Sequence, residues 1–132
     1  MEIVRRAVDA FNRGDLDEAL ELYAADAVWD WSNSRGLNPV VSRGRDEIRA
    51  TWERFLANFD GVRVELEEVV EVEDGLVMTE NVGHVRGRDG IEVQARSAWL
   101  IRTLDGKIAS LTMYQTRDEA LDAAGSSEEK AG

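Results

Sequence analysis

Residues 23–31 read Tyr-Ala-Ala-Asp-Ala-Val-Trp-Asp-Trp, and this stretch marks a change from helix to strand. The residues before it repeat apolar side chains at helical spacing, whereas Trp29 and Trp31 flank a single acid, Asp30, as in a half-buried strand. Two further tryptophans, Trp52 and Trp99, fall in later segments. Four tryptophans in a small domain indicate either the walls of an apolar pocket or core packing, and both readings stay open.

The whole chain is one domain by length, with 132 residues. It has no cysteine, which excludes disulfides, thiolate metal sites and cysteine nucleophiles. Its 27 acidic and 16 basic residues give a net charge of −11, which argues against a nucleic-acid partner and against an anionic membrane surface. The first residues show no apolar signal region, so we expect a cytoplasmic protein.

Three segments before residue 60 have the period of amphipathic helices. The first helix begins near Ile3, the second after the N-cap Asp15, and the third near Gly44. Residues 32–43, which lead into the third helix, are expected to be a loop that could act as a lid. The expected buried stripes are Ile3, Val4, Ala7, Val8 and Phe11; then Leu16, Ala19, Leu20 and Tyr23; then Ile48, Trp52, Phe55, Leu56 and Phe59.

After Gly61 the apolar period changes to two. Three Asp-Gly pairs, at 74–75, 89–90 and 105–106, predict tight turns between four long strands, and Val69-Val70 suggests a bulge or a change of face. A short helix over 117–124 would complete a domain of residues 1–125, with 126–132 as a flexible tail. The predicted fold is α+β: three N-terminal helices packed on a curled antiparallel sheet that forms a cone, a cystatin-like α+β barrel.

Three motifs resemble those of SnoaL-like proteins, members of the nuclear-transport-factor-2-like superfamily. They are 22–28 (Leu-Tyr-Ala-Ala-Asp-Ala-Val), 43–48 (Arg-Gly-Arg-Asp-Glu-Ile) and 104–108 (Leu-Asp-Gly-Lys-Ile). The similarity spans about residues 3–125 and implies the cone fold and a homodimer through the outer sheet face. It also implies which strand residues point inward, namely Ser97, Trp99, Ile101, Leu111, Met113 and Gln115, and leaves Ser110, Thr112 and Tyr114 on the outer face.

The catalytic groups of two related enzymes do not carry over. The general base of ketosteroid isomerase would fall at Trp31, its helix tyrosine near Ala7, and its hydrogen-bonding acid near Ser97 or Ala98. Limonene-epoxide hydrolase has an aspartate where this chain has Met113. Of the hydrolase's Arg-x-Asp pair, this chain has the arginine, Arg96, but has Ala98 in place of the aspartate. The resemblance therefore leaves SnoaL-type cyclases, which use one acid–base residue in an apolar pocket, as the least excluded enzymes.

Two residues are candidates for that acid–base role. His84, the only histidine, can exchange a proton near neutral pH if it points inward, and otherwise it packs on the sheet or faces water. Asp30 is either a carboxylate in an apolar environment or, by alternation with its tryptophan neighbours, outside. Glu80 shares a strand face with His84 but stands roughly 13 Å away. No ligand spacing predicts a metal, and we expect no cofactor.

The leading functional hypothesis is a domain that binds a small hydrophobic or polycyclic molecule in an apolar cone. It includes cofactor-free isomerase or cyclase chemistry with His84 or Asp30 as the catalytic group. The alternatives are a ligand carrier without turnover and a structural dimerisation module whose cone is filled by its own side chains. The expected ligand-binding residues are Tyr23, Trp29, Trp31, Trp52, Phe55, Phe59, Trp99, Ile101, Leu111, Met113 and Gln115.

Overall fold

The computed structural model describes residues 2–34 and 40–131, and within them the chain forms four helices and six strands. Their order is α1 (Glu2–Asn12), α2 (Leu16–Glu21), β1 (Tyr23–Asp30), β2 (Val41–Arg43), α3 (Gly44–Ala57), β3 (Gly61–Glu73), β4 (Leu76–Arg86), β5 (Glu92–Leu104), β6 (Lys107–Tyr114) and α4 (Arg117–Ala131). The α+β plan predicted from the sequence is confirmed.

One sheet holds all the strands, in the order β2-β1-β6-β5-β4-β3. The four-strand meander from β3 to β6 is antiparallel, as expected. The expectation of a wholly antiparallel sheet is wrong at one place, because β1 runs parallel to β6. Strand β1 follows α1 and α2 in the chain and pairs with β6, the last strand of the meander, so its direction is set by the long connection between them rather than by a hairpin.

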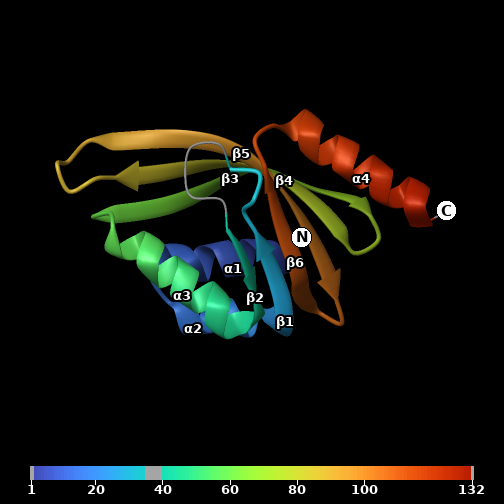
Figure 1. Ribbon diagram of the computed structural model, residues 1–132, viewed down its shortest axis with the longest axis horizontal. Coiled ribbons are helices and arrows are strands. Elements are labelled where there is room, and N and C mark those ends of the chain that lie inside the picture. The colour runs from blue at the N-terminus through green and yellow to red at the C-terminus, as the bar shows by residue number, and fades with distance from the viewer. Residues whose placement is uncertain (1, 35–39, 132) are drawn as a thin grey trace.

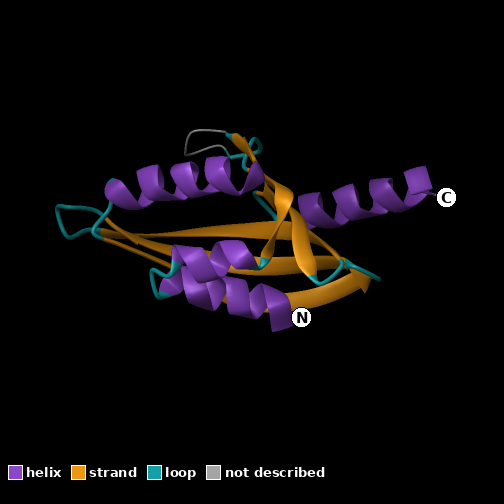
Figure 2. Ribbon diagram, turned by 90° about the horizontal axis from the view of Figure 1, so that it is seen from below, coloured by secondary structure: helices purple, strands orange, loops and turns teal. Residues whose placement is uncertain are grey.

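The curled sheet has a helix layer on each side. In Figure 1, α1, α2 and α3 gather on one side of the long strands and α4 lies apart from them; Figure 2, after a quarter turn, again shows α4 away from the other three helices. The main core lies under the first three helices and includes Val4, Ile48, Trp52 and Ile101. A second cluster lies beneath α4, where Ala120 and Ala124 pack on Leu76, Met78, Ala98 and Leu100.

A bulge in β3 precedes the two adjacent valines Val69 and Val70, which pack on opposite faces of the sheet. The pairing with β4 shifts between Leu66 and Glu68. Even-numbered residues therefore face the first three helices before the bulge, and odd-numbered residues face them after it. Val64, Leu66 and Val69 pack against the main core, whereas Val70 packs against the cluster under α4. The bulge thus lets one strand supply apolar side chains to both layers.

Some boundaries differ from those expected. The second helix ends at Glu21 rather than at Tyr23, because β1 already begins at Tyr23. The segment expected to be a loop contains β2, which pairs with β1; the part with Gly36 and Pro39 lies outside the described residues. The last helix continues to Ala131, beyond its expected end.

Two side chains fasten α1 and α3 to the strands. Asn12 at the end of α1 donates from Nδ2 to the Val64 carbonyl and accepts from the Val64 amide, both at 2.8 Å. Arg45 in α3 donates from Nε and Nη2 to the Tyr23 carbonyl at 2.9 and 2.6 Å. These contacts hold the helices at fixed positions over the concave face, where the cavity lies.

Candidate functional site: an aromatic cavity

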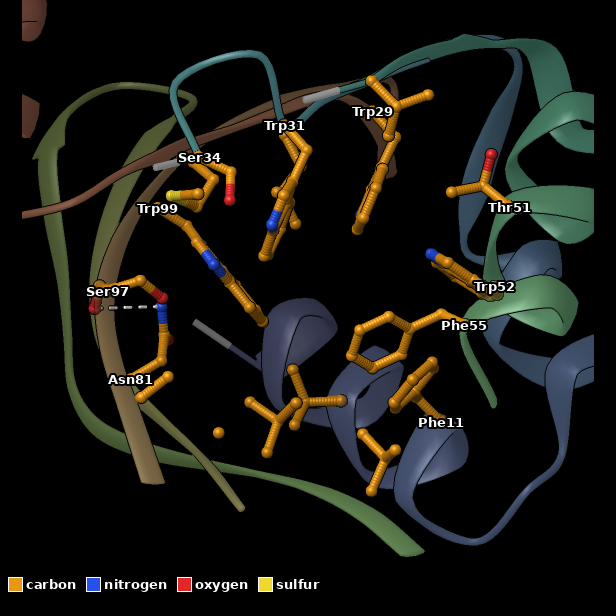
Figure 3. Close-up of a pocket in the computed structure, with 18 of the residues that line it drawn as sticks. Phe11, Trp29, Trp31, Ser34, Thr51, Trp52, Phe55, Asn81, Ser97 and Trp99 are labelled. Atoms are coloured by element: carbon orange, nitrogen blue, oxygen red, sulfur yellow. Dashed lines mark hydrogen bonds between the residues drawn. The ribbon is translucent and has the colours of Figure 1, made fainter. Parts of the chain in front are cut away.

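A cavity of about 770 Å³ lies between α1, α3 and the concave face of the sheet. Figure 3 shows Trp29, Trp31 and Trp99 on one part of its wall, with Trp52, Phe55 and Phe11 on the helix side. Every one of the eleven residues expected to bind a ligand lines it: Tyr23, Trp29, Trp31, Trp52, Phe55, Phe59, Trp99, Ile101, Leu111, Met113 and Gln115. The inward faces expected for β5 and β6 are therefore the faces that line the cavity.

The aromatic rings form two groups. Trp29 and Trp31 stack with centroids 4.4 Å apart and an interplanar angle of 8°, because residues two apart on an extended chain share a face. Trp31 also meets the edge of Trp99 at 6.0 Å. On the helix side, Trp52 is in edge contact with Phe11 at 5.3 Å and with Tyr23 at 5.6 Å. Flat ring faces on two sides of a cavity suit a flat apolar guest.

His84 does not line the cavity, so it lacks the inward orientation that its predicted acid–base role requires. Its neighbours Gly83 and Val85 line the cavity, and alternation along β4 puts the imidazole on the outer face. There its Nε2 lies 3.0 Å from Glu65 Oε1 and its Nδ1 3.3 Å from Glu92 Oε1. The imidazole thus links three strands on the face opposite the cavity.

Asp30 also lies outside the cavity wall, in line with the alternative reading from alternation. Its Oδ1 accepts hydrogen bonds from the Ser32 amide at 2.9 Å and the Ser32 hydroxyl at 2.6 Å. Burial, with a smaller contribution from the Asp30 carboxylate, raises the pKa of Tyr114, a residue of the outer-face cluster. Glu80, the parity partner of His84, lies 3.9 Å from Arg117 of α4.

The cavity wall has few ionisable side chains. Among the residues that the structure describes, those lining it are Tyr23, Arg54 and Arg96, without a carboxylate or an imidazole. Burial raises the pKa of the Tyr23 phenol, which therefore stays neutral near pH 7. Arg96 forms an ion pair with Glu67 and is largely exposed. The lining that the structure describes is therefore predominantly apolar.

Among the described residues, three side-chain polar atoms on the inner face of the sheet are buried without a hydrogen-bond partner: Thr79 Oγ1, Asn81 Oδ1 and Trp99 Nε1. A buried group of this kind costs about 1–3 kcal/mol when it has no partner. Asn81 and Trp99 line the cavity, whereas Thr79 is not among the lining residues.

Sequence reasoning missed the lining residues from α1, β3 and β4. Helix α1 is predicted to supply core residues only, and the inward face of β4 stays open in the sequence because Met78 and Val82, which share the parity of His84, are apolar. Leu76 and Met78 are apolar because α4 covers them, which hydrophobicity alone does not reveal. The missed residues are Val4, Ala7, Val8, Phe11, Val62, Val64, Asn81, Gly83 and Val85.

The described ranges, 2–34 and 40–131, offer no candidate metal site and no candidate membrane-spanning helix. They contain no group of three or more His, Asp or Glu side chains placed to hold a metal ion. Nor does any helix within them have the length and apolar character needed to cross a membrane.

An α+β cone with helices closing an apolar interior is the architecture of the nuclear-transport-factor-2-like fold. The chain matches the SnoaL-like domain over residues 4–111, and it belongs to this family. An uncharacterised protein of Mycobacterium tuberculosis is 31% identical over 125 residues, which cover 93% of each chain.

Solved structures share the fold at lower identity. A hypothetical protein from Catenulispora acidiphila with a ketosteroid isomerase-like fold, in complex with trimethylamine, has a TM-score of 0.76 at 21% identity, over 88% of this chain and 86% of its own. A Mycobacterium tuberculosis protein in complex with estradiol-17beta-hemisuccinate has a TM-score of 0.75 at 19% identity, over 88% and 92%. At these identities the likeness concerns the fold.

Proposed function

We propose that this protein binds a flat hydrophobic or polycyclic small molecule in the aromatic cavity and releases it unchanged. The observation that carries the proposal is the cavity itself, about 770 Å³ in volume and walled by Trp29, Trp31, Trp52 and Trp99. Ligand sites typically measure about 300–1,000 Å³ and have mainly apolar and aromatic walls. This volume is large enough for a molecule of several fused rings.

Binding without turnover is favoured over isomerase or cyclase chemistry because the described lining of the cavity holds no side chain suited to carry a proton. Such reactions need a group that titrates near the working pH within hydrogen-bond reach of the ligand. Of the cavity-lining side chains in the described ranges, Tyr23 is neutral and Arg54 and Arg96 are cationic at neutral pH. A relative of the same fold holds a steroid ester, which supports a polycyclic guest here.

The test is a titration of purified protein with a panel of steroids, aromatic polyketides and terpenoids, followed by tryptophan fluorescence and thermal shift. A ligand at a hundred times its Kd should add about 2.7 kcal/mol of stability. Trp31→Ala should weaken binding, since it removes the ring that contacts both Trp29 and Trp99. The matched control is Leu121→Ala on α4, which lies outside the cavity wall and should bind as wild type.

Two outcomes would count against the proposal. Absence of any shift across the panel would favour a structural module, and conversion of a bound compound to product would restore the enzyme hypothesis.

A homodimer through the outer sheet face stays a prediction. Helix α4 covers the end of that face near Leu76, Met78 and Leu100, which leaves the part of β3 to β5 around His84 for a partner copy. Light scattering on the purified protein would give the oligomeric state directly, and a monomer at high concentration would end this expectation.

A further inference from the structure

Unpaired polar atoms concentrate at one place in the cavity wall. In the register of β4 and β5, Asn81 is opposite Ser97, and Trp99 lies two residues further along the same face. Such diagonal neighbours have Cβ atoms roughly 7 Å apart. Figure 3 shows Asn81, Ser97 and Trp99 together on one side of the cavity, opposite Trp52 and Phe55. Most other lining side chains are apolar, so this pair is a local polar spot.

The two unpaired atoms have opposite hydrogen-bonding character. Asn81 Nδ2 donates to the Ser97 carbonyl oxygen at 3.4 Å, and since a carbonyl can only accept, the Oδ1 atom is the one left free as an acceptor. Trp99 Nε1 is a donor only. Asn81 is 2% exposed and Trp99 7% exposed, so bulk water does not satisfy either atom. Both residues border the cavity, and because neither atom has exposed surface in this structure, a guest would supply the missing partners after a small turn of each side chain.

We propose that Asn81 and Trp99 bind a hydroxyl group of the ligand. The hydroxyl hydrogen is donated to Asn81 Oδ1, and the hydroxyl oxygen accepts from the Trp99 indole N–H. A carbonyl or an ether oxygen can satisfy only the indole, because neither has a proton to donate. The ligand class is therefore a polycyclic phenol or alcohol. This inference rests on the proposed binding function and narrows it.

Three probes of nearly equal shape separate the two hydrogen bonds: pyrene, 1-methoxypyrene and 1-hydroxypyrene. Their own fluorescence reports binding to wild type and variants without relying on the protein's tryptophans. Wild type should bind 1-methoxypyrene more tightly than pyrene, because the ether oxygen can accept from the Trp99 indole, and it should bind 1-hydroxypyrene roughly tenfold more tightly than 1-methoxypyrene, about the effect of the additional buried hydrogen bond to Asn81. Asn81→Leu should remove that preference while pyrene binding is kept, and Trp99→Phe should weaken 1-hydroxypyrene and 1-methoxypyrene relative to pyrene.

Thr79→Val is the matched control. It also removes a buried, unpaired polar atom, but Thr79 does not line the cavity, so the preference for 1-hydroxypyrene should be unchanged. Near-ultraviolet circular dichroism would establish that each variant keeps its native packing. A failure of the folded Asn81→Leu variant to bind even pyrene would show that Asn81 supports the wall rather than reads a hydroxyl, and would overturn the inference.

The remaining outcomes are distinguishable. Equal binding of all three probes by wild type would overturn the hydroxyl inference and leave the apolar-ligand function standing. If wild type binds none of them, and none of the wider panel, both the inference and the proposed function fall.

Discussion

Thr79→Val should make this protein more stable. Thr79 is fully buried and its Oγ1 has no hydrogen-bond partner, so the hydroxyl loses its hydration on folding and gains nothing. Valine has nearly the same shape and an equal preference for strands. Removing the unpaired group should add about 1–2 kcal/mol to the free energy of unfolding.

The size of the domain converts this energy into a melting shift. At about 2.1 cal/mol/K per residue, 132 residues give an unfolding entropy of about 280 cal/mol/K near the melting temperature. A gain of 1–2 kcal/mol then corresponds to about 4–7 °C in Tm. Calorimetry of the free protein, with urea unfolding at 25 °C as a second measure, would show it.

The matched control is Ser42→Ala. Ser42 is equally buried, but its hydroxyl lies 2.7 Å from Thr51 Oγ1 and is therefore satisfied. This variant should lose about 1 kcal/mol. If Thr79→Val instead lowers Tm as Ser42→Ala does, the Thr79 hydroxyl has a partner such as a bound water, and the reasoning about unpaired atoms on this face of the sheet is refuted.

Two further predictions concern contacts outside the cavity wall. Asn12→Ala should destabilise the protein by about 1–3 kcal/mol, because it removes both hydrogen bonds to the Val64 backbone; Asn12→Asp, which can keep only the bond from the Val64 amide, should fall between in urea unfolding. His84→Gln and Asp30→Asn should leave the Kd of any cavity ligand unchanged, since neither side chain lines the cavity; a tenfold weakening in a folded variant, measured by fluorescence titration, would contradict the assignment of faces.

Local chemistry explains which parts of the fold were predictable. The Asp-Gly turns form where expected, with Gly75, Gly90 and Gly106 all at positive φ, a conformation that glycine adopts without strain. Asp15 caps α2 by accepting from the Glu18 amide at 3.1 Å. Both signals involve residues within a few positions of one another, so the sequence shows them directly.

The inward residues of the candidate site were predictable where the family resemblance assigned a face to the strand, and not where the apolar pattern alone had to decide. The inward residues of β5 and β6 followed from the family resemblance. In β4, however, α4 covers one face and the cavity borders the other, so both parities are apolar and the orientation of His84 was ambiguous. Asn81 was overlooked for the same reason. The parallel pairing of β1 with β6 depends on the path between distant segments, which no local pattern encodes.

That parallel pairing also determines when the cavity can exist. The strand that carries Trp29 obtains its long partner only from β6, and Asn33 Nδ2 donates to the Met113 carbonyl across 80 positions of the chain. Contacts so distant in sequence form late, because a long loop must close before they contribute. During synthesis the strand that carries Trp29 can pair with β2, but its pairing with β6 must wait until β6 has left the ribosome. A ligand can be captured only by a molecule whose folding is already complete.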